Sequence, residues 1–310
     1  MVSEVPLLRK ICEEYATKDK RIKVIHQRNQ GLPAARNTGL AVARGKYIAS
    51  CDSDDYWDPS LLSTAYSLAE AEQADCVVFN YNIVDTSGAI TQHRPWKAGS
   101  WDIHNINDRL HFLLGNKDIG WEMWTRLMRK DIFDKYQIRG CLTCNNYAED
   151  LGFTTVYNMF AKKIVCTNEY LYFYCLRSES IMGQSKKRIR LDELNNLSQY
   201  IYNYYSSYFS QKQDLKLFGI LHFHIMFIGY LQLIGTPMYH TLPDELAKIQ
   251  NQEYYITQTK QIFQCYHSMK DFFGKDFACR ILLLSHFCIH RSWRRFCTES
   301  SIYYKYLSKG

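Results

Sequence analysis

The chain has 310 residues, of which 46% are hydrophobic and 22% are charged, so a disordered or low-complexity protein is excluded. A formal net charge of +7 favours anionic partners such as phosphate groups, acidic lipids or nucleic acids, without choosing among them. The N-terminus lacks the pattern of a secretory signal, from which we expect a cytoplasmic protein.

The eleven cysteines are odd in number and have no framework spacing, which in a cytoplasmic chain indicates reduced thiols. Cys141 and Cys144 form a CxxC pair. A zinc site would need two further ligands, and no second CxxC or HxxxH lies nearby. The sequence therefore favours ordinary loop thiols over a zinc centre.

The first elements in chain order alternate between helix and strand. Apolar residues at helical spacing predict an amphipathic helix over Val5–Ala16, and a short strand is expected at Ile22–His26. Residues Gly31–Ala43 indicate a loop that enters a helix, because Pro33 suits a first helical turn. A second strand is expected at Lys46–Cys51.

The next helix is predicted to begin with Asp58 as its N-cap and Pro59 as its first residue, and to run towards Glu72. A third strand follows at Cys76–Asn82. This alternation predicts an α/β fold with a mostly parallel sheet covered on both faces. In such sheets ligands bind at the carboxyl ends of the strands, where Asp52–Asp55 are expected.

The second half of the chain is predicted to be helical except for an extended part before residue 175. A helix is expected after Tyr147 to about Lys162, followed by extended segments at Lys163–Thr167 and Tyr170–Tyr174. Beyond this point we expect a division into a domain at 1–185 and a helical C-terminal region at 186–310. Within that region Leu217–Gly235 is borderline for a membrane span of roughly 20 apolar residues, and a buried helix is favoured.

Three carboxylates gather in the sequence Cys51-Asp-Ser-Asp-Asp. Crowding acids is costly unless a cation neutralises them, and oxygen ligands suit Mg²⁺ or Mn²⁺. Such a site can hold a diphosphate through the metal. A solvated acidic turn is the alternative, and these residues alone support both interpretations equally.

Three further segments carry candidate site residues. Arg36 lies in a helix whose N-terminus attracts phosphate, although an ordinary surface arginine fits as well. Glu149 and Asp150 begin another helix, where Asp150 is a candidate general base or simply a favourable helix-start charge. Arg177 and Ser180 suit a diphosphate clamp or a plain strand end.

These motifs, taken together in order, resemble the family 2 glycosyltransferases over roughly residues 8–182. The matching segments are Arg21–Gln27, Gly31–Gly39, Gly45–Ile48 running into Asp52–Asp55, Glu149–Asp150 and Arg177–Ser180. The joint order is far more specific than any single motif, and Asp-Ser-Asp-Asp looks like the DxD motif of that family.

The resemblance implies a GT-A-like fold, a nucleotide-sugar donor that we expect to be a UDP-sugar, a divalent Mg²⁺ or Mn²⁺ ion, and inverting transfer. It assigns Arg36, Asp52 and Arg177 to donor binding, Asp54 to the metal and Asp150 to the catalytic base. The implied acceptor is a saccharide or a lipid-linked molecule of cell-surface polysaccharide synthesis.

One departure from the family pattern affects the expected activity. Family members begin with a strand–helix–strand unit that holds the nucleotide base, and this chain shows no such unit before Val5. We therefore expect an N-terminally truncated sheet in which Ile22–His26 and Lys46–Cys51 lose their neighbours. As a consequence, we expect the chain to bind its donor poorly or to be inactive.

Two alternatives belong to other functional classes. A non-catalytic remnant would keep only an interaction role, exerted through the helical C-terminal region. Nucleic-acid binding is suggested by His290–Phe296, where basic and aromatic residues alternate, but the same pattern suits a membrane surface. We favour peripheral attachment to the inner face of the membrane over nucleic acid, with a solvated helix end as the plain alternative.

Overall fold

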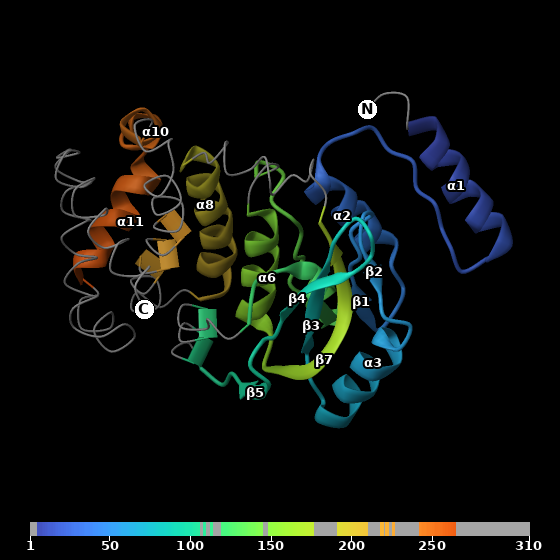
Figure 1. Ribbon diagram of the computed structural model, residues 1–310. Coiled ribbons are helices and arrows are strands. Elements are labelled where there is room, and N and C mark those ends of the chain that lie inside the picture. The colour runs from blue at the N-terminus through green and yellow to red at the C-terminus, as the bar shows by residue number, and fades with distance from the viewer. Residues whose placement is uncertain are drawn as a thin grey trace.

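The computed structural model has a curled sheet at its centre with helices on both faces (Figure 1). It describes residues 5–105, 108–109, 112–113, 119–144, 148–176, 191–209, 218–219, 221–222, 225–226 and 242–264.

Seven strands build the sheet within the described residues. They are β1 (Tyr47–Ala49), β2 (Tyr56–Trp57), β3 (Cys76–Val84), β4 (Ile90–Arg94), β5 (Gly99–Asp102), β6 (Arg126–Arg129) and β7 (Lys163–Cys175). The strand order is β1-β6-β3-β7-β2, with β4 added to β3 and β5 added to β7. The long strands β3 and β7 therefore form the middle of the sheet.

The prediction of a mostly parallel sheet is wrong for the described strands. β3 pairs with β7 in parallel, and the five other pairings are antiparallel. A parallel pair needs a long crossover, which a helix supplies just before β7, whereas β4 folds back on β3 through a tight turn. The sequence analysis missed β4 and β5 because both are short, polar and largely exposed.

The helices follow the same chain order. They are α1 (Val5–Lys18), α2 (Leu32–Val42), α3 (Leu61–Glu72), the 3₁₀ turn η1 (Met123–Thr125), α5 (Lys130–Lys135), α6 (Glu149–Phe160), α8 (Leu191–Tyr208), α10 (Leu242–Ile249) and α11 (Glu253–Gln264). The predicted helices at the positions of α1, α2, α3 and α6 are confirmed, as are the strands at β1, β3 and β7.

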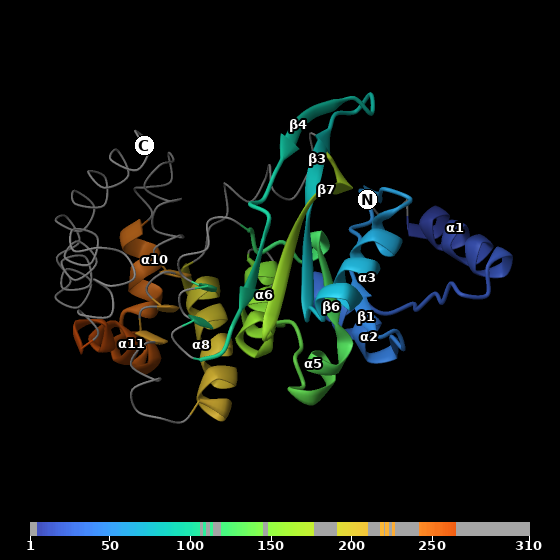
Figure 2. The ribbon, with the colours of Figure 1, turned by 90° about the horizontal axis from the view of Figure 1, so that it is seen from below.

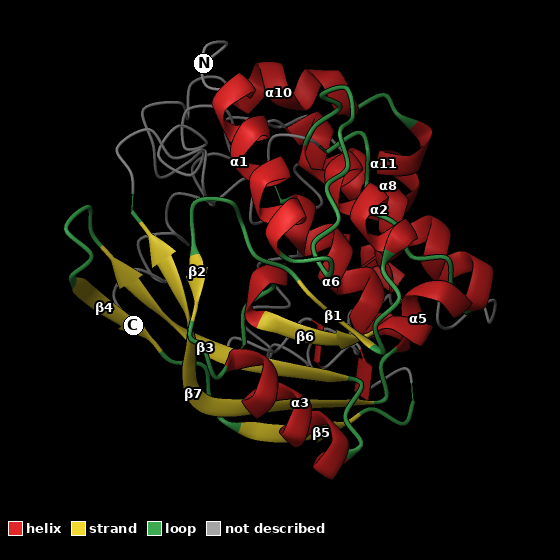
Figure 3. Ribbon diagram, turned by 90° about the vertical axis from the view of Figure 1, so that its right-hand side faces the viewer, coloured by secondary structure: helices red, strands yellow, loops and turns green. Residues whose placement is uncertain are grey.

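The two faces of the sheet pack against different helices. Along β3, Cys76 and Val78 join a cluster with α6 and α8, whereas Val77 and Phe79 join a cluster with α3. Figure 2 shows α6 and α3 on opposite sides of β3 and β7, and Figure 3 looks onto α3 lying across the strands. This alternation buries β3 on both faces and makes it the rigid centre of the fold.

The C-terminal helices form further layers beyond α6. In Figure 1, α6, α8 and α11 follow one another away from the sheet, and α8 shares the apolar cluster of α6 through Leu194, Leu197 and Ile201. The described part of the C-terminal region is thus helical, as predicted. The expected domain boundary at 185/186 lies outside the described residues, as do His290–Phe296 and most of Leu217–Gly235.

Membrane crossing requires a long apolar helix, and none of the helices in the described ranges is both long and apolar enough.

Two local predictions are wrong. Residues Ile22–His26 form no strand, and the side chains of Ile22 and Ile25 are 40% and 43% exposed. A strand pattern becomes a strand only where a neighbouring strand offers hydrogen bonds. Among the described residues this segment pairs with no strand, and the Ile22 amide bonds the carbonyl of Asp19 in the preceding turn, at 3.0 Å. The helix α3 begins at Leu61, later than predicted, and Ser60 ahead of it makes no side-chain cap hydrogen bond. The Asp58 carboxylate accepts hydrogen bonds from the Ser60 amide and hydroxyl, at 2.8 and 2.5 Å, and so stabilises the turn that precedes the helix.

Candidate active site

Arg36 reaches the site from the second turn of α2. The helix begins after Gly31, whose φ of 86° lies in the left-handed region that favours glycine, and it has proline in its first turn. Asn37, the next residue, ties α2 to the loop ahead of α6 by exchanging hydrogen bonds with the backbone of Gly140, at 2.6 and 3.2 Å. The side chain of Arg36 is only 8% exposed. Its guanidinium is therefore held in a fixed place.

Three carboxylates surround this guanidinium. Arg36 donates to Oδ1 of Asp150 and, at 3.2 Å, to Oδ1 of Asp52, while Oε1 of Glu149 lies 3.6 Å from Nη1. Glu149 and Asp150 form the first turn of α6, where the positive end of the helix dipole stabilises negative charge. The other oxygen of Asp150 accepts a hydrogen bond from the Met123 amide at 3.4 Å.

The electrostatics of the cluster follow from burial and from the excess of acids. Burial, assisted by the charge of Asp150, raises the pKa of Glu149 to about 7. Burial also raises the pKa of Asp150, although Arg36 opposes this effect. Burial would lower the pKa of Arg36, but the charges of Asp150, Asp52 and Glu149 outweigh it and raise the pKa. A site with three acids and one guanidinium stabilises an added proton or cation.

The acidic turn after β1 is anchored to β7 by its last carboxylate. Asp55 accepts hydrogen bonds from the hydroxyl of Tyr172 and from the amide of Cys175, both at 2.8 Å. The same hydroxyl of Tyr172 accepts a hydrogen bond from the amide of Asp52 at 3.1 Å. Asp55 is therefore a structural residue of the turn, and it fixes the backbone that carries Asp52 and Asp54.

Asp54 differs from its neighbours because its carboxylate makes no hydrogen bond or ion pair with the described part of the chain. Asp54 as a whole is half-buried in the turn. Within the described ranges, no three Cys, His, Asp or Glu side chains stand close enough together to hold a metal ion by themselves. Asp54 has free hard oxygens suited to Mg²⁺ or Mn²⁺, and such ions commonly take one or two carboxylates together with substrate phosphates.

The structure thus brings together most of the residues predicted for the site. Arg36, Asp52, Glu149 and Asp150 meet at one cluster, and Asp54 belongs to the same turn as Asp52. Arg177 and Ser180 lie outside the described residues. The individual roles of these side chains in binding and catalysis stay predictions.

Sequence reasoning missed the aromatic residues that support the site. Trp124 of η1 lies 4.5 Å from Tyr172 and 5.7 Å from Tyr174, measured between ring centroids, and 4.8 Å from Tyr81. These rings connect η1, β3 and β7 behind the acidic turn. A tyrosine on a strand normally indicates core packing, so the sequence carried no signal for the hydroxyl contact of Tyr172.

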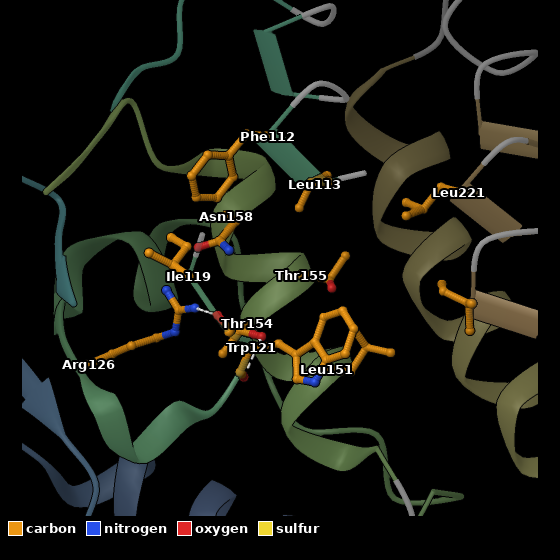
Figure 4. A pocket seen from close by; sticks show the side chains of 12 residues that line it. Phe112, Leu113, Ile119, Trp121, Arg126, Leu151, Thr154, Thr155, Asn158 and Leu221 are labelled. Carbon is orange, nitrogen blue, oxygen red and sulfur yellow. Dashed lines mark hydrogen bonds between the residues drawn. The ribbon is translucent and has the colours of Figure 1, made fainter. Parts of the chain in front are cut away.

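A pocket lies along α6, beside the residues that come after Asp150 in the helix (Figure 4). Leu151, Thr154, Thr155 and Asn158 line it from the helix, and the opposite walls are mostly apolar. The Thr154 hydroxyl donates to the backbone carbonyl of Trp121 at 2.9 Å. The pocket therefore adjoins the site through residues 120–121 but holds no acid–base pair of its own.

The CxxC pair is buried rather than on the surface. The sulfur atoms of Cys141 and Cys144 are 2.8 Å apart, and Cys144 also contacts the backbone carbonyl of Glu193 on α8. These cysteines belong to the loop ahead of α6, and Cys144 packs it against α8.

Comparison with known proteins agrees with this arrangement. Residues 5–137 match glycosyl transferase family 2. The putative glycosyltransferase EpsH of Bacillus subtilis is 29% identical over 73% of this chain and 66% of its own length. The cholesterol galactosyltransferase of Borreliella burgdorferi is 25% identical over 84% of this chain and 75% of its own length. The chain spans 58% to 66% of EpsH, the Streptococcus pneumoniae glycosyltransferase GlyG and B. subtilis EpsJ.

Solved structures show the same fold. S. aureus TarS residues 1–349, in complex with UDP-GlcNAc, superimposes with a TM-score of 0.63 at 15% identity over 96% of this chain and 79% of TarS 1–349. The complex with UDP gives a TM-score of 0.62 at 16% identity, covering 96% and 78% of the two chains. The curled sheet with its helices is therefore a GT-A fold, and residues 5–137 of the chain form a glycosyl transferase family 2 domain.

Proposed function

We propose that this protein transfers a sugar from a UDP-sugar donor to a hydroxyl group of a saccharide or lipid-linked acceptor, with inversion at the anomeric carbon. The observation that carries the proposal is the cluster of Arg36 with Asp52, Glu149 and Asp150, beside the unpaired carboxylate of Asp54. The chemistry needs one acid to face the donor and another to take a proton, and this cluster supplies both.

The donor side is assigned to Arg36, Asp52 and Asp54. Arg36 supplies a fixed positive charge and hydrogen-bond donors that suit a phosphate. Asp54 would hold Mg²⁺ or Mn²⁺ together with phosphate oxygens of the donor. A bound divalent ion would stabilise the negative charge that develops on the departing nucleoside diphosphate. The similarity to TarS, solved with UDP and UDP-GlcNAc, supports a UDP-sugar as donor.

The acceptor side is assigned to Asp150. Its carboxylate takes the proton of the acceptor hydroxyl as that oxygen bonds to the anomeric carbon and the bond from this carbon to the diphosphate oxygen breaks. Attack from the side opposite the leaving group inverts the configuration. Since burial raises the pKa of Asp150, the carboxylate is a stronger base than an exposed aspartate.

The names of relatives support the acceptor class. One relative is a cholesterol galactosyltransferase, and another is the poly(ribitol-phosphate) beta-glucosyltransferase of Bacillus spizizenii, which is 26% identical over 54% of this chain. Lipid and polymer acceptors thus occur among similar proteins, and we propose a role in cell-surface polysaccharide synthesis, beside the membrane.

The test is release of UDP from UDP-glucose, UDP-galactose and UDP-GlcNAc by the purified chain, with Mg²⁺, with Mn²⁺ or with a chelator. We expect metal-dependent release with at least one donor, and its loss in Asp54→Ala. The matched control is Glu169→Ala, which removes an exposed carboxylate of β7. If the wild-type chain neither binds nor cleaves any of these donors, an interaction role without catalysis replaces the proposal.

A further inference from the structure

Arg94 and Tyr81 form a pair of solvent-facing polar side chains on the sheet. Arg94 is the last residue of β4 and lies directly opposite Tyr81 of β3 in the antiparallel register, and Figure 2 shows the two strands side by side. The side chains of such a pair share one face of the sheet, with Cβ atoms about 5 Å apart. Arg94 is exposed, and Tyr81 is half-buried with a hydroxyl that is not a buried unpaired atom. A ligand in solution can therefore reach both groups.

Neither polar group is used within the described part of the chain. There the Arg94 guanidinium forms no ion pair, and the Tyr81 hydroxyl forms no hydrogen bond. Burial, together with the charge of Glu122, raises the pKa of Tyr81 to about 12, so its hydroxyl keeps its proton at neutral pH. Arginine carries a fixed positive charge and a planar set of N–H donors. The pair thus offers positive charge and hydrogen-bond donors, which match the oxygens of a phosphate group.

The pair continues a row of side chains that ends at the acidic turn. Tyr81 lies opposite Tyr172 of β7 in the parallel register, and the Tyr172 hydroxyl holds that turn. Neighbouring strands lie about 4.8 Å apart, so Arg94, two strands away from β7, lies roughly 10 Å from Tyr172 across the sheet. The two phosphates of a diphosphate share one oxygen atom. A donor diphosphate held beside Asp54 is therefore too short to reach Arg94 as well.

Trp124 connects the pair to the proposed base. Its ring lies 4.8 Å from that of Tyr81, and the amide of the residue before it donates to Oδ2 of Asp150. Glu122 comes two residues before Trp124. Burial raises the pKa of Glu122, the charge of Asp150 raises it further, and the charge of Arg94 lowers it. Arg94 and Asp150 therefore lie within electrostatic reach of the same residue, on the side of the site where the acceptor loses its proton.

We propose that Arg94 and Tyr81 bind a phosphate group of the acceptor, so that the hydroxyl group attacking the donor belongs to a phosphate-bearing molecule. The Arg94 guanidinium pairs with two phosphate oxygens, and the Tyr81 hydroxyl donates to one of them. This assignment rests on the proposed transferase function and adds the chemical class of the acceptor. The carboxyl groups of Glu122 and Asp150 oppose an anion at this place, so binding depends on the charge of Arg94.

The experiment measures phosphate affinity and donor affinity on the same samples. The phosphate probe is glycerol phosphate, with glycerol as its uncharged counterpart, followed by ligand-observed NMR with and without saturating UDP and Mg²⁺. Calorimetry measures the affinity for UDP-sugars. We compare wild type with Arg94→Gln and Tyr81→Phe, which keep an exposed polar side chain and the aromatic ring, respectively. Arg9→Gln is the matched control, because Arg9 is an exposed arginine of α1.

Two larger probes separate the possible sources of the phosphate. A soluble glycerol-phosphate oligomer presents the phosphates of a polymer, and phosphatidylglycerol vesicles present those of lipid headgroups. The probe that Arg94→Gln binds more weakly than Arg9→Gln does identifies the source. If Arg94→Gln and Arg9→Gln bind both probes equally, the proposal is overturned.

We expect wild type and Arg9→Gln to bind glycerol phosphate but not glycerol. The affinity should fall about tenfold in Arg94→Gln and less in Tyr81→Phe, because a charge-assisted hydrogen bond is stronger than a neutral one. UDP-sugar affinity should stay the same. Absence of phosphate binding by wild type, unchanged phosphate affinity in Arg94→Gln, or an equal fall in UDP-sugar affinity overturns the acceptor assignment. A wild-type chain that binds glycerol phosphate through Arg94 but neither binds nor cleaves UDP-sugars contradicts the transferase function and leaves the phosphate site standing.

Discussion

Arg36 joins the N-terminal part of the fold to the proposed base, because its guanidinium donates to Oδ1 of Asp150 from the neighbouring helix. The same group bonds Asp52 in the acidic turn at 3.2 Å. One side chain therefore sets the relative positions of α2, the turn after β1 and the start of α6. Arg36 offsets part of the negative charge around Asp150 and holds its carboxylate at a defined place.

Replacement of Asp150 by asparagine tests the base directly. Asparagine keeps the shape of the side chain and can still pair with the Met123 amide, but it cannot take a proton. We expect sugar transfer to fall ~10²- to 10⁴-fold, the usual contribution of a general base. Transfer rates and UDP-sugar affinity are measured together, and a variant that retains transfer would contradict the assignment.

Replacement of Arg36 by glutamine should destabilise the fold, because three partly buried acids lose their cation. Removing one partner of a buried ion pair costs ~3–5 kcal/mol, and the 18% and 28% exposure of Asp150 and Asp52 reduces the expected loss to ~2–3 kcal/mol. The double variant with Asp150→Asn should regain part of this loss. Urea unfolding measures the free energies, and strict additivity would show that the two residues are not coupled.

Tyr172→Phe should weaken the acidic turn. The change removes the hydroxyl that bonds Asp52 and Asp55, at an expected cost of ~1–3 kcal/mol in the free energy of unfolding. UDP-sugar affinity should fall as well, because the turn carries Asp52 and Asp54. The control is Tyr56→Phe, since the exposed Tyr56 stacks on Phe173 through its ring, which phenylalanine retains. Equal stability of the two variants would contradict this account.

The pH dependence of stability should report on His222. This histidine is buried, and its Nδ1 lies 2.7 Å from the Ser198 hydroxyl, with which it forms a hydrogen bond. Burial lowers the pKa of His222 to about 3. In the unfolded chain it takes up a proton below about pH 6.5. Its burial therefore lowers stability progressively as the pH falls from about 6.5 towards 3.

A variant without a titratable side chain at position 222 isolates this effect. Between pH 7.5 and 5.0, wild type should lose ~2 kcal/mol more than His222→Asn, at ~1.4 kcal/mol for each pH unit below 6.5. Asparagine can still bond the Ser198 hydroxyl, and carboxylate titrations are common to both proteins. Parallel pH profiles from urea unfolding would show that His222 is not buried in its neutral form.

Local sequence signals predicted those elements whose stability is itself local. The helices α1, α2 and α6 carry helical spacing or residues typical of a helix start, and β3 opens with the apolar run Cys76–Phe79, so all four could be placed. The segment Ile22–His26 has a strand pattern too, but a strand depends on a partner that its own residues do not encode. Strand direction was missed for a similar reason, because β4 and β5 are polar and owe their structure to β3 and β7.

The proposed site shows the same difference between features set by local sequence and features that depend on distant partners. The order of motifs predicted that Arg36, Asp52 and Asp150 act together, and they meet in one cluster. Asp55 was grouped with the possible metal ligands, but its carboxylate accepts hydrogen bonds from the Tyr172 hydroxyl and the Cys175 amide.

The two hydrogen bonds of Asp55 make the acidic turn and the end of β7 a single mechanical unit. Its carboxylate bonds the Cys175 amide, and the chain continues from there through Leu176, which bonds the backbone of Val84. Any movement of the acidic turn would have to pull on the end of β7 or break these bonds. The turn and the end of β7 are therefore expected to move together, without any separate relay between them.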